Sequence, residues 1–154
     1  MTTTARLRQR DLFTRRWRKQ LEPQKEVTSL HIPLVAMLRW CLRPDVIWRH
    51  VPNGEHRDPR TAAKLKAMGV LPGSADLEFH WAEWHSVVGT MRRMLHLELK
   101  VGNRKQNAAQ AGFALAMKLL GDEYHVARSI DEAIGILGER GLLRPNVEVC
   151  GRRW

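Results

Sequence analysis

Cysteine is scarce in this chain of 154 residues, and long apolar runs are missing. The two cysteines, Cys41 and Cys150, lie far apart and form no C-x-x-C pair, which is typical of a protein in a reducing compartment and argues against a zinc site. No stretch reaches the roughly 18 to 20 consecutive apolar residues of a membrane-spanning helix, and no apolar signal segment follows the basic N-terminus. We therefore expect a cytoplasmic protein with no membrane partner.

Acidic residues are outnumbered, because 16 Asp and Glu stand against 26 Lys and Arg and leave a formal net charge of +10. An excess of this size in a short chain usually serves a polyanion, either nucleic acid or an anionic membrane surface. Since the hydropathy disfavours a membrane, nucleic acid is the expected partner. The hydrophobic share of 44% is enough to fill the core of one domain.

Both ends of the chain are basic. We expect residues 1–22 to form an N-terminal arm, residues 23–140 the folded domain and residues 141–154 a C-terminal tail. The arm could follow a phosphate backbone, form an amphipathic helix or remain a solvated tail, and the sequence leaves these three possibilities open.

Two segments, 73–79 and 95–100, alternate apolar and polar residues with the period of two that a half-buried strand requires. Each predicted strand therefore has one apolar and one polar face. The expected apolar face carries Ala75, Leu77, Phe79, Leu95, Leu97 and Leu99, and the polar face carries Asp76, Glu78, His80, His96, Glu98 and Lys100.

Asp76, Glu98 and Lys100 come together if these strands pair, because residues two apart on a strand lie roughly 6.5 to 7 Å apart on one face. Carboxylate oxygens gathered at one point suit a hard cation such as Mg²⁺. A lysine beside that cation can orient a bound water or neutralise charge on an attacked phosphate. The set predicts metal-assisted phosphodiester hydrolysis, although Glu98-x-Lys100 alone is also what an ordinary solvated strand shows.

Periodicity and capping residues predict the remaining elements. We expect helices over 26–42, 59–68, 106–120 and 131–139, and strands over 46–51 and 124–128. Pro33 is expected in the first turn of its helix, where proline is tolerated. The helix over 106–120 is expected to bury a stripe made of Ala109, Phe113, Ala116, Met117 and Leu120.

Residues 81–93 are expected to connect the two central strands, and the connection is long for a simple hairpin. Burial in the core is our preferred interpretation of its tryptophans, Trp81 and Trp84, with base stacking and a dimer contact as the alternatives.

Basic side chains near the short helix are expected to contact phosphates, with a solvated helix face as a nearly equal alternative. The candidate nucleic-acid contacts are Asn53, Arg57, Arg60, Lys64, Arg104 and Lys105. Gln106 and Gln110 lie one turn apart near the start of the following helix and face back toward the strand ends.

Four segments together resemble the VRR-NUC domain of the PD-(D/E)XK nuclease superfamily, in order over residues 26–137. The segments are Trp48 to Gly54, Ala62 to Val70, Gly73 to Leu77 and Leu97-Glu98-Leu99-Lys100. The likeness is greatest to short stand-alone phage and bacterial members and implies a homodimer. It also implies a restriction-endonuclease-like α/β core, a mixed central sheet flanked by helices in the order αβββαβ, here with an extra short helix.

The resemblance implies roles for particular residues. By position, Asp76, Glu98 and the backbone carbonyl of Leu99 match the family's ligands for Mg²⁺ or Mn²⁺. Lys100 matches the catalytic lysine, and Gln110 matches a helix glutamine that assists the water or the phosphate, with Gln106 as its nearest rival.

Two positions depart from the family pattern. Glu26 corresponds to the first-helix glutamate but stands one residue further from the pair Leu30-His31 than usual, and Glu78 is the alternative ligand. Ala75 stands where the family has proline, which is expected to change backbone stiffness rather than chemistry.

These residues favour a Mg²⁺- or Mn²⁺-dependent endonuclease acting on branched or otherwise structured DNA. The alternative is a catalytically inactive DNA-binding module of the same fold. A basic RNA-binding or assembly protein would explain the charge but not the acids on buried strands.

Overall fold

The structure is a computed structural model that describes residues 26–52, 58–149 and 151–154. The expected N-terminal arm, together with Asn53, Arg57 and Cys150, lies outside the described residues. Among the described helices, none is both long and apolar enough to cross a membrane.

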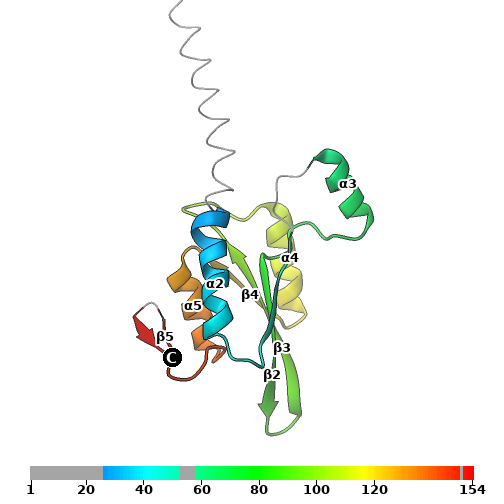
Figure 1. Ribbon diagram of the computed structural model, residues 1–154. Coiled ribbons are helices and arrows are strands. Elements are labelled where there is room, and N and C mark those ends of the chain that lie inside the picture. The colour runs from blue at the N-terminus through cyan, green and yellow to red at the C-terminus, as the bar shows by residue number, and fades with distance from the viewer. Residues whose placement is uncertain (1–25, 53–57, 150) are drawn as a thin grey trace, which may run out of the picture.

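A four-stranded mixed sheet forms the centre of the molecule (Figure 1). In chain order the elements are η1 (Val27–His31), α2 (Ile32–Cys41), β1 (Ile47–His50), α3 (Pro59–Ala67), β2 (Leu77–His85), β3 (Gly89–Leu99), α4 (Ala108–Leu119), β4 (Glu123–Ala127), α5 (Ile130–Glu139), β5 (Glu148–Val149) and β6 (Arg152–Arg153). The sheet order is β1-β2-β3-β4, with antiparallel pairs except for the parallel pair β3 and β4. The predicted fold class, a mixed sheet in the order αβββαβ with an extra short helix, is confirmed.

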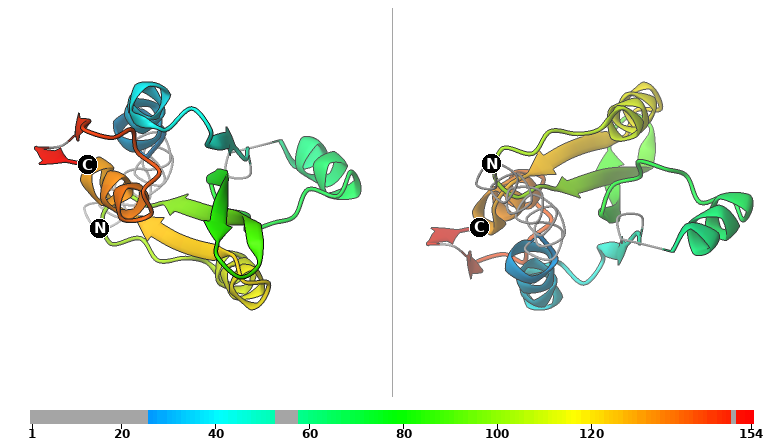
Figure 2. Two further views of the ribbon diagram at one scale, coloured as in Figure 1. Left: turned by 90° about the horizontal axis from the view of Figure 1, so that it is seen from below. Right: turned by 90° about the horizontal axis from the view of Figure 1, so that it is seen from above.

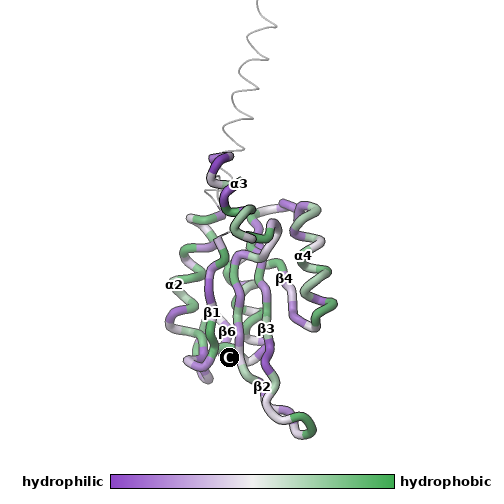
Figure 3. Tube along the Cα trace, turned by 90° about the vertical axis from the view of Figure 1, so that its right-hand side faces the viewer, coloured by the Kyte–Doolittle hydropathy of each residue, from purple (hydrophilic) through white to green (hydrophobic). Residues whose placement is uncertain are grey.

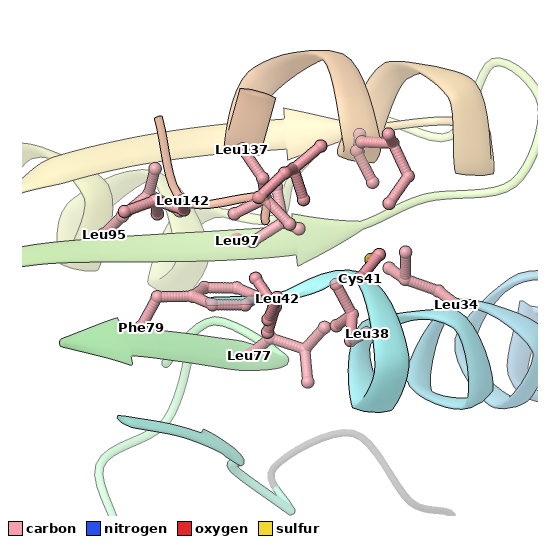
Figure 4. Packing of buried hydrophobic residues seen from close by; sticks show 14 of the residues in the cluster. Leu34, Leu38, Cys41, Leu42, Leu77, Phe79, Leu95, Leu97, Leu137 and Leu142 are labelled. Atoms are coloured by element: carbon pink, nitrogen blue, oxygen red, sulfur yellow. The ribbon is translucent and has the colours of Figure 1, made fainter. Parts of the chain in front are cut away.

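The main core lies on the leucine face of β2 and β3, as the alternation predicts. Leu77, Phe79 and Leu97 are fully buried there, and α2 and α5 cover them with residues such as Leu38 and Leu137 (Figure 4). Burying a side chain of this size is worth about 1.5–3 kcal/mol relative to leaving it exposed. This face therefore supplies most of the driving force that holds β3 in place.

A second, smaller cluster lies on the opposite face of the sheet, beneath α4. Figure 2 shows α4 and α2 on opposite sides of the sheet. The cluster consists of Ala75, Phe113, Ala114 and Tyr124. The prediction that Ala75 shares a face with Leu77 is wrong, because β2 begins only at Leu77 and the alternation does not extend through residues 73–76.

Pro33 lies inside a continuous helical run, and a π-helical turn precedes it. Residues Val27–His31 form a π-helical turn in which the Ile32 N–H donates to the carbonyl oxygen of Val27. Pro33 is the second residue of α2, but α2 continues η1 without a break, since His31 and Ile32 both have helical backbone angles. Leu30, Leu34, Leu38 and Cys41 are buried, and Cys41 is a free thiol.

The long connection expected between the central strands is instead part of a hairpin. β2 runs on to His85 and β3 begins at Gly89, whose φ of +76° suits the tight turn between them. β1 pairs with β2 only as far as His80, so the outer hairpin extends beyond the rest of the sheet (Figure 3). Trp81 is buried as preferred, but Trp84 is 72% exposed, which contradicts its expected place in the core.

The apolar stripe predicted for the helix after β3 is correct only in part. Phe113 is buried and Met117 is partly buried, whereas Ala109, Ala116 and Leu120 are exposed. The surface beneath α4 is narrow and partly polar, because His96 and Glu98 lie on it, so only a thin line of helix side chains is covered.

The chain after α5 packs against the main core. Leu142, Leu143 and Val149 are buried there, and β5 pairs with β6. The Arg144 side chain donates to the Leu42 carbonyl oxygen at 2.9 Å. The domain limit at residue 140 stays a prediction.

Candidate active site at the end of strand β3

Asp76 precedes β2 and lies against the C-terminal end of β3. Its Oδ2 accepts a hydrogen bond from the Leu99 N–H at 2.7 Å. Its backbone carbonyl accepts from the Val51 N–H at 2.9 Å and lies 2.9 Å from Nδ1 of His50. Contacts of its carboxylate with β3, and of its backbone carbonyl with the end of β1, therefore fix Asp76, although it lies just outside regular strand structure.

Glu98 lies on β3 with its carboxylate buried beside Asp76. Its Oε1 lies 2.5 Å from the ammonium nitrogen of Lys100 and also accepts a hydrogen bond from Nε2 of Gln110. Its Oε2 is buried and has no hydrogen-bond partner among the described residues. Glu98 is 1% exposed and Lys100 7%. The predicted set of Asp76, Glu98 and Lys100 therefore does come together in space.

The carboxylates of Asp76 and Glu98 repel each other when both are ionised. Burial, and after it the neighbouring charge of Asp76, raise the pKa of Glu98 to about 7 against the opposing effect of Lys100. Burial also raises the pKa of Asp76, against the Leu99 N–H and the charge of Lys100. A cation placed between such groups would relieve both desolvation and mutual repulsion.

Glu26 lies closer to this site than Glu78 does. Glu26 accepts from the Val101 N–H at 3.2 Å and lies 3.4 Å from the Arg104 guanidinium, and its charge contributes to the raised pKa of Glu98. Glu78 instead pairs with Arg49, at 2.7 Å, on another part of the sheet. Of the two candidates for a further acidic ligand, Glu26 is the better placed.

The start of α4 fixes the position of Gln110. Asn107 caps the helix: its side chain accepts from the Gln110 N–H at 2.9 Å, and the Gln110 Oε1 accepts from the Asn107 N–H at 3.0 Å. This capping box leaves the Gln110 amide nitrogen directed at Glu98. Gln106, the rival candidate, donates to the Tyr124 hydroxyl at 3.0 Å instead.

Gly73 allows the Asp76 loop to approach the start of α4 closely. Its φ is +88°, and a Cβ atom there would lie 2.4 Å from the carbonyl carbon and oxygen of Ala109. A side chain would therefore separate the loop that carries Asp76 from the helix that carries Gln110.

A cavity of about 370 Å³ opens beside these groups. Its lining consists of Gly73, Ser74, Asp76, Lys100, Arg104, Lys105, Asn107 and Gln110. Three of these side chains are cationic, so the cavity suits an anionic group such as a phosphate. Two of the predicted nucleic-acid contacts, Arg104 and Lys105, therefore lie at the site.

The other described candidates, Arg60 and Lys64, lie on α3, a helix that buries none of its residues and stands away from the sheet (Figure 1). Asp58 caps α3 through a 3.1 Å bond from the Arg60 N–H, and Pro59 occupies its first turn.

The donor set fits a hard divalent cation. Asp76 and Glu98 offer carboxylate oxygens, and the buried Oε2 of Glu98 has no protein partner among the described residues. Oxygen ligands of this kind suit Mg²⁺ or Mn²⁺ rather than a softer metal. Within the described ranges, no three His, Cys, Asp or Glu side chains are grouped closely enough to hold a metal by themselves.

One solved structure, described as a VRR_NUC domain protein, is similar to this chain. The two are 29% identical, with a TM-score of 0.45, and the match covers 59% of this chain and 64% of that one. This chain thus spans less than two thirds of the matched structure. No protein-family model matches the chain, and no curated protein matches it.

Two site residues escaped the sequence analysis. Asn107 could have been found, because Asn107-x-x-Gln110 has the spacing of a capping box. The close approach of Gly73 to Ala109 had no local signal, since it joins segments more than thirty residues apart in the chain.

Gly73→Ala should destabilise the protein more than Gly121→Ala does. Both glycines have φ near +88°, but a Cβ at Gly121 would meet nothing within 4 Å. The shared backbone strain should cost about 1–2 kcal/mol, and overpacking against Ala109 a further 1–3 kcal/mol at Gly73. Urea unfolding measures both, and equal losses would contradict the proposed contact.

The metal-free protein should lose stability as pH rises from about 4.5 to about 7. Native Glu98 keeps its proton up to a pKa of about 7, whereas unfolded glutamate titrates near 4.5, so the native state binds more protons in this window. Urea unfolding in EDTA should show a fall of up to about 3 kcal/mol that Glu98→Gln removes.

Mg²⁺ should restore stability most above pH 7, because it binds the ionised carboxylate. Glu139→Gln is the control, since that side chain is 69% exposed. A pH profile that Glu98→Gln leaves unchanged would refute the burial argument, and Mg²⁺ without effect on unfolding would refute the cation site.

Proposed function

We propose that this protein is a Mg²⁺- or Mn²⁺-dependent endonuclease that hydrolyses phosphodiester bonds in DNA. The observation that carries the proposal is the convergence of Asp76, Glu98 and Lys100 beside one cationic cavity, which Asp76 and Lys100 line. A cationic cavity attracts a phosphate, and paired buried carboxylates attract a divalent cation. The combination is what hydrolysis of a phosphate diester requires.

In this proposal Asp76, Glu98 and the backbone carbonyl of Leu99 hold the cation, with Glu26 as a further acidic group nearby. When bound, the cation polarises the phosphate and lowers the pKa of a water molecule. Lys100, held at 2.5 Å from Glu98, orients the attacking water and compensates the negative charge that develops on the phosphate.

Gln110 and the basic loop position the substrate. Two bonds to Asn107 fix the Gln110 amide, so its Nε2 can hold Glu98 or a water without reorganisation. Arg104 and Lys105 bind neighbouring phosphates from the rim of the cavity.

We further propose that the chain is a member of the VRR-NUC family, acts on branched or otherwise structured DNA and works as a homodimer. The segments over 48–54, 62–70, 73–77 and 97–100 support the membership. The alternative is an inactive DNA-binding module of the same fold. The presence of all three groups, Asp76, Glu98 and Lys100, favours catalysis over that alternative.

The decisive experiment offers the protein labelled duplex, flap and four-way-junction DNA, with Mg²⁺, Mn²⁺ or EDTA. We expect metal-dependent products, with the branched substrates cut faster than the duplex. Binding without product under any divalent cation would leave the inactive module as the function.

Lys100→Ala should reduce kcat by about 10²–10⁴-fold while DNA affinity in EDTA stays within a few fold, because it removes a charge that acts on the transition state. Asp76→Ala should weaken Mn²⁺ binding as well, measured by calorimetry. Lys118→Ala, which removes the same charge from the last turn of α4, is the control. Wild-type rates for both site variants would place the chemistry elsewhere.

A further inference from the structure

The loop between β3 and α4 brings Arg104 and Lys105 to the cavity, yet its backbone has few fixed points of its own. Residues 101–106 belong to no helix or strand, and Gly102 has a φ of +61°. Residues outside the loop hold it at its start, middle and end. Glu26 accepts from the Val101 N–H and lies 3.4 Å from the Arg104 guanidinium. Gln106 donates to the Tyr124 hydroxyl at the end of the loop, and Arg128 binds its middle.

Arg128 makes two hydrogen bonds to the loop from one nitrogen. Its Nη1 donates to the Gly102 carbonyl oxygen at 2.6 Å and to the Arg104 carbonyl oxygen at 3.0 Å. The two carbonyls lie on either side of Asn103, so one guanidinium spans the turn that presents Arg104. A permanently charged donor bound to two carbonyls is a strong and directional contact.

The backbone of Arg128 is itself well anchored. It follows the last residue of β4, Ala127, whose carbonyl accepts from the Lys100 N–H at 2.9 Å. The Arg128 N–H donates to Oε2 of Glu132 on α5 at 2.7 Å. The side chain thus reaches the loop from a rigid strand end that also supports the lysine of the site.

We infer that Arg128 is a positioning residue for the substrate: it holds the 101–106 loop so that Arg104 and Lys105 line the cavity and bind the phosphates beside the scissile one. This inference rests on the proposed nuclease function. Without Arg128 the middle of the loop loses its contacts at the Gly102 and Arg104 carbonyls, so the substrate must order that part and some binding free energy is lost to ordering. The chemical groups of Asp76, Glu98 and Lys100 remain in place, because their contacts do not include Arg128.

Arg140 provides a matched control. It is also an arginine, and its Nε donates to Oε2 of Glu123 at 2.6 Å, at the opposite end of β4 from Arg128. Arg140→Ala therefore removes the same charge and one strand-end contact without touching the loop.

The experiment compares Arg128→Ala and Arg140→Ala in steady-state cleavage of a labelled flap DNA and in binding of the same DNA in EDTA. For Arg128→Ala we expect KM and the dissociation constant to rise about tenfold, with kcat within about twofold and Mn²⁺ affinity unchanged. For Arg140→Ala all four should stay within about twofold. Equal effects of the two variants, or a fall in kcat or Mn²⁺ affinity with KM unchanged, would overturn the inference.

A double-mutant cycle separates positioning from direct contact between Arg128 and DNA. In an Arg104→Ala/Lys105→Ala background, Arg128→Ala should add less than twofold to the dissociation constant, because the residues it positions are gone. A full tenfold addition there means that Arg128 itself contacts DNA and overturns the positioning role.

The outcomes also separate this inference from the proposed function. If the unmodified protein binds but never cuts DNA, the nuclease proposal fails, and the binding constants in EDTA still decide the role of Arg128. If the unmodified protein does not bind DNA, both fail.

Discussion

The proximity of two buried carboxylates is the constraint on which the rest of this structure depends. Asp76 and Glu98 lie at the end of β3 with too little solvent to stabilise both charges, and Lys100 offsets only part of the cost. Such a cluster persists because the opposite face of the same strands is packed with leucines that hold the backbone in place. The stability of the apolar face maintains an unfavourable arrangement on the polar one.

The order of the elements brings the remaining groups to the same place. β3 and β4 are parallel neighbours, so the chain must cross over through α4 to start β4. The start of α4 consequently lies near the end of β3, within reach of Glu98 for Gln110. The end of β4 lies at the same edge, which explains why Lys100 and Arg128 are neighbours although far apart in sequence.

The central site was accessible from the sequence because it depends on two local rules. Alternation assigned Glu98 and Lys100 to the polar face, and helix spacing directed Gln110 toward them. Asp76 lies at the site although it precedes β2, because the Leu99 N–H donates to its carboxylate. Contacts between distant backbones were not accessible. No residue near Gly73 in the sequence predicts its close approach to Ala109. Likewise, no residue near Arg128 predicts its hydrogen bonds to the carbonyls of a loop more than twenty residues earlier.

The errors in burial have a related cause. Ala116, Leu120 and Trp84 have side chains that suit a core, but whether they are covered depends on how far the neighbouring layer extends. The sheet beneath α4 is too narrow for a wide stripe, and β1 pairs with β2 only as far as His80, so it leaves the outer hairpin uncovered on that side. Periodicity reports which side a residue faces and carries no information on the size of the opposing surface.

The turn of the hairpin between β2 and β3 is a site where a label could be attached far from the carboxylates. This turn lies ten strand residues from Leu99, which at about 3.3 Å each is roughly 30 Å from the carboxylates. A fluorescent dye or an inserted peptide at Val87, which is 83% exposed, would disturb neither the cavity nor the leucine core. That span also matches the range over which energy transfer to a labelled nucleic acid is sensitive to distance.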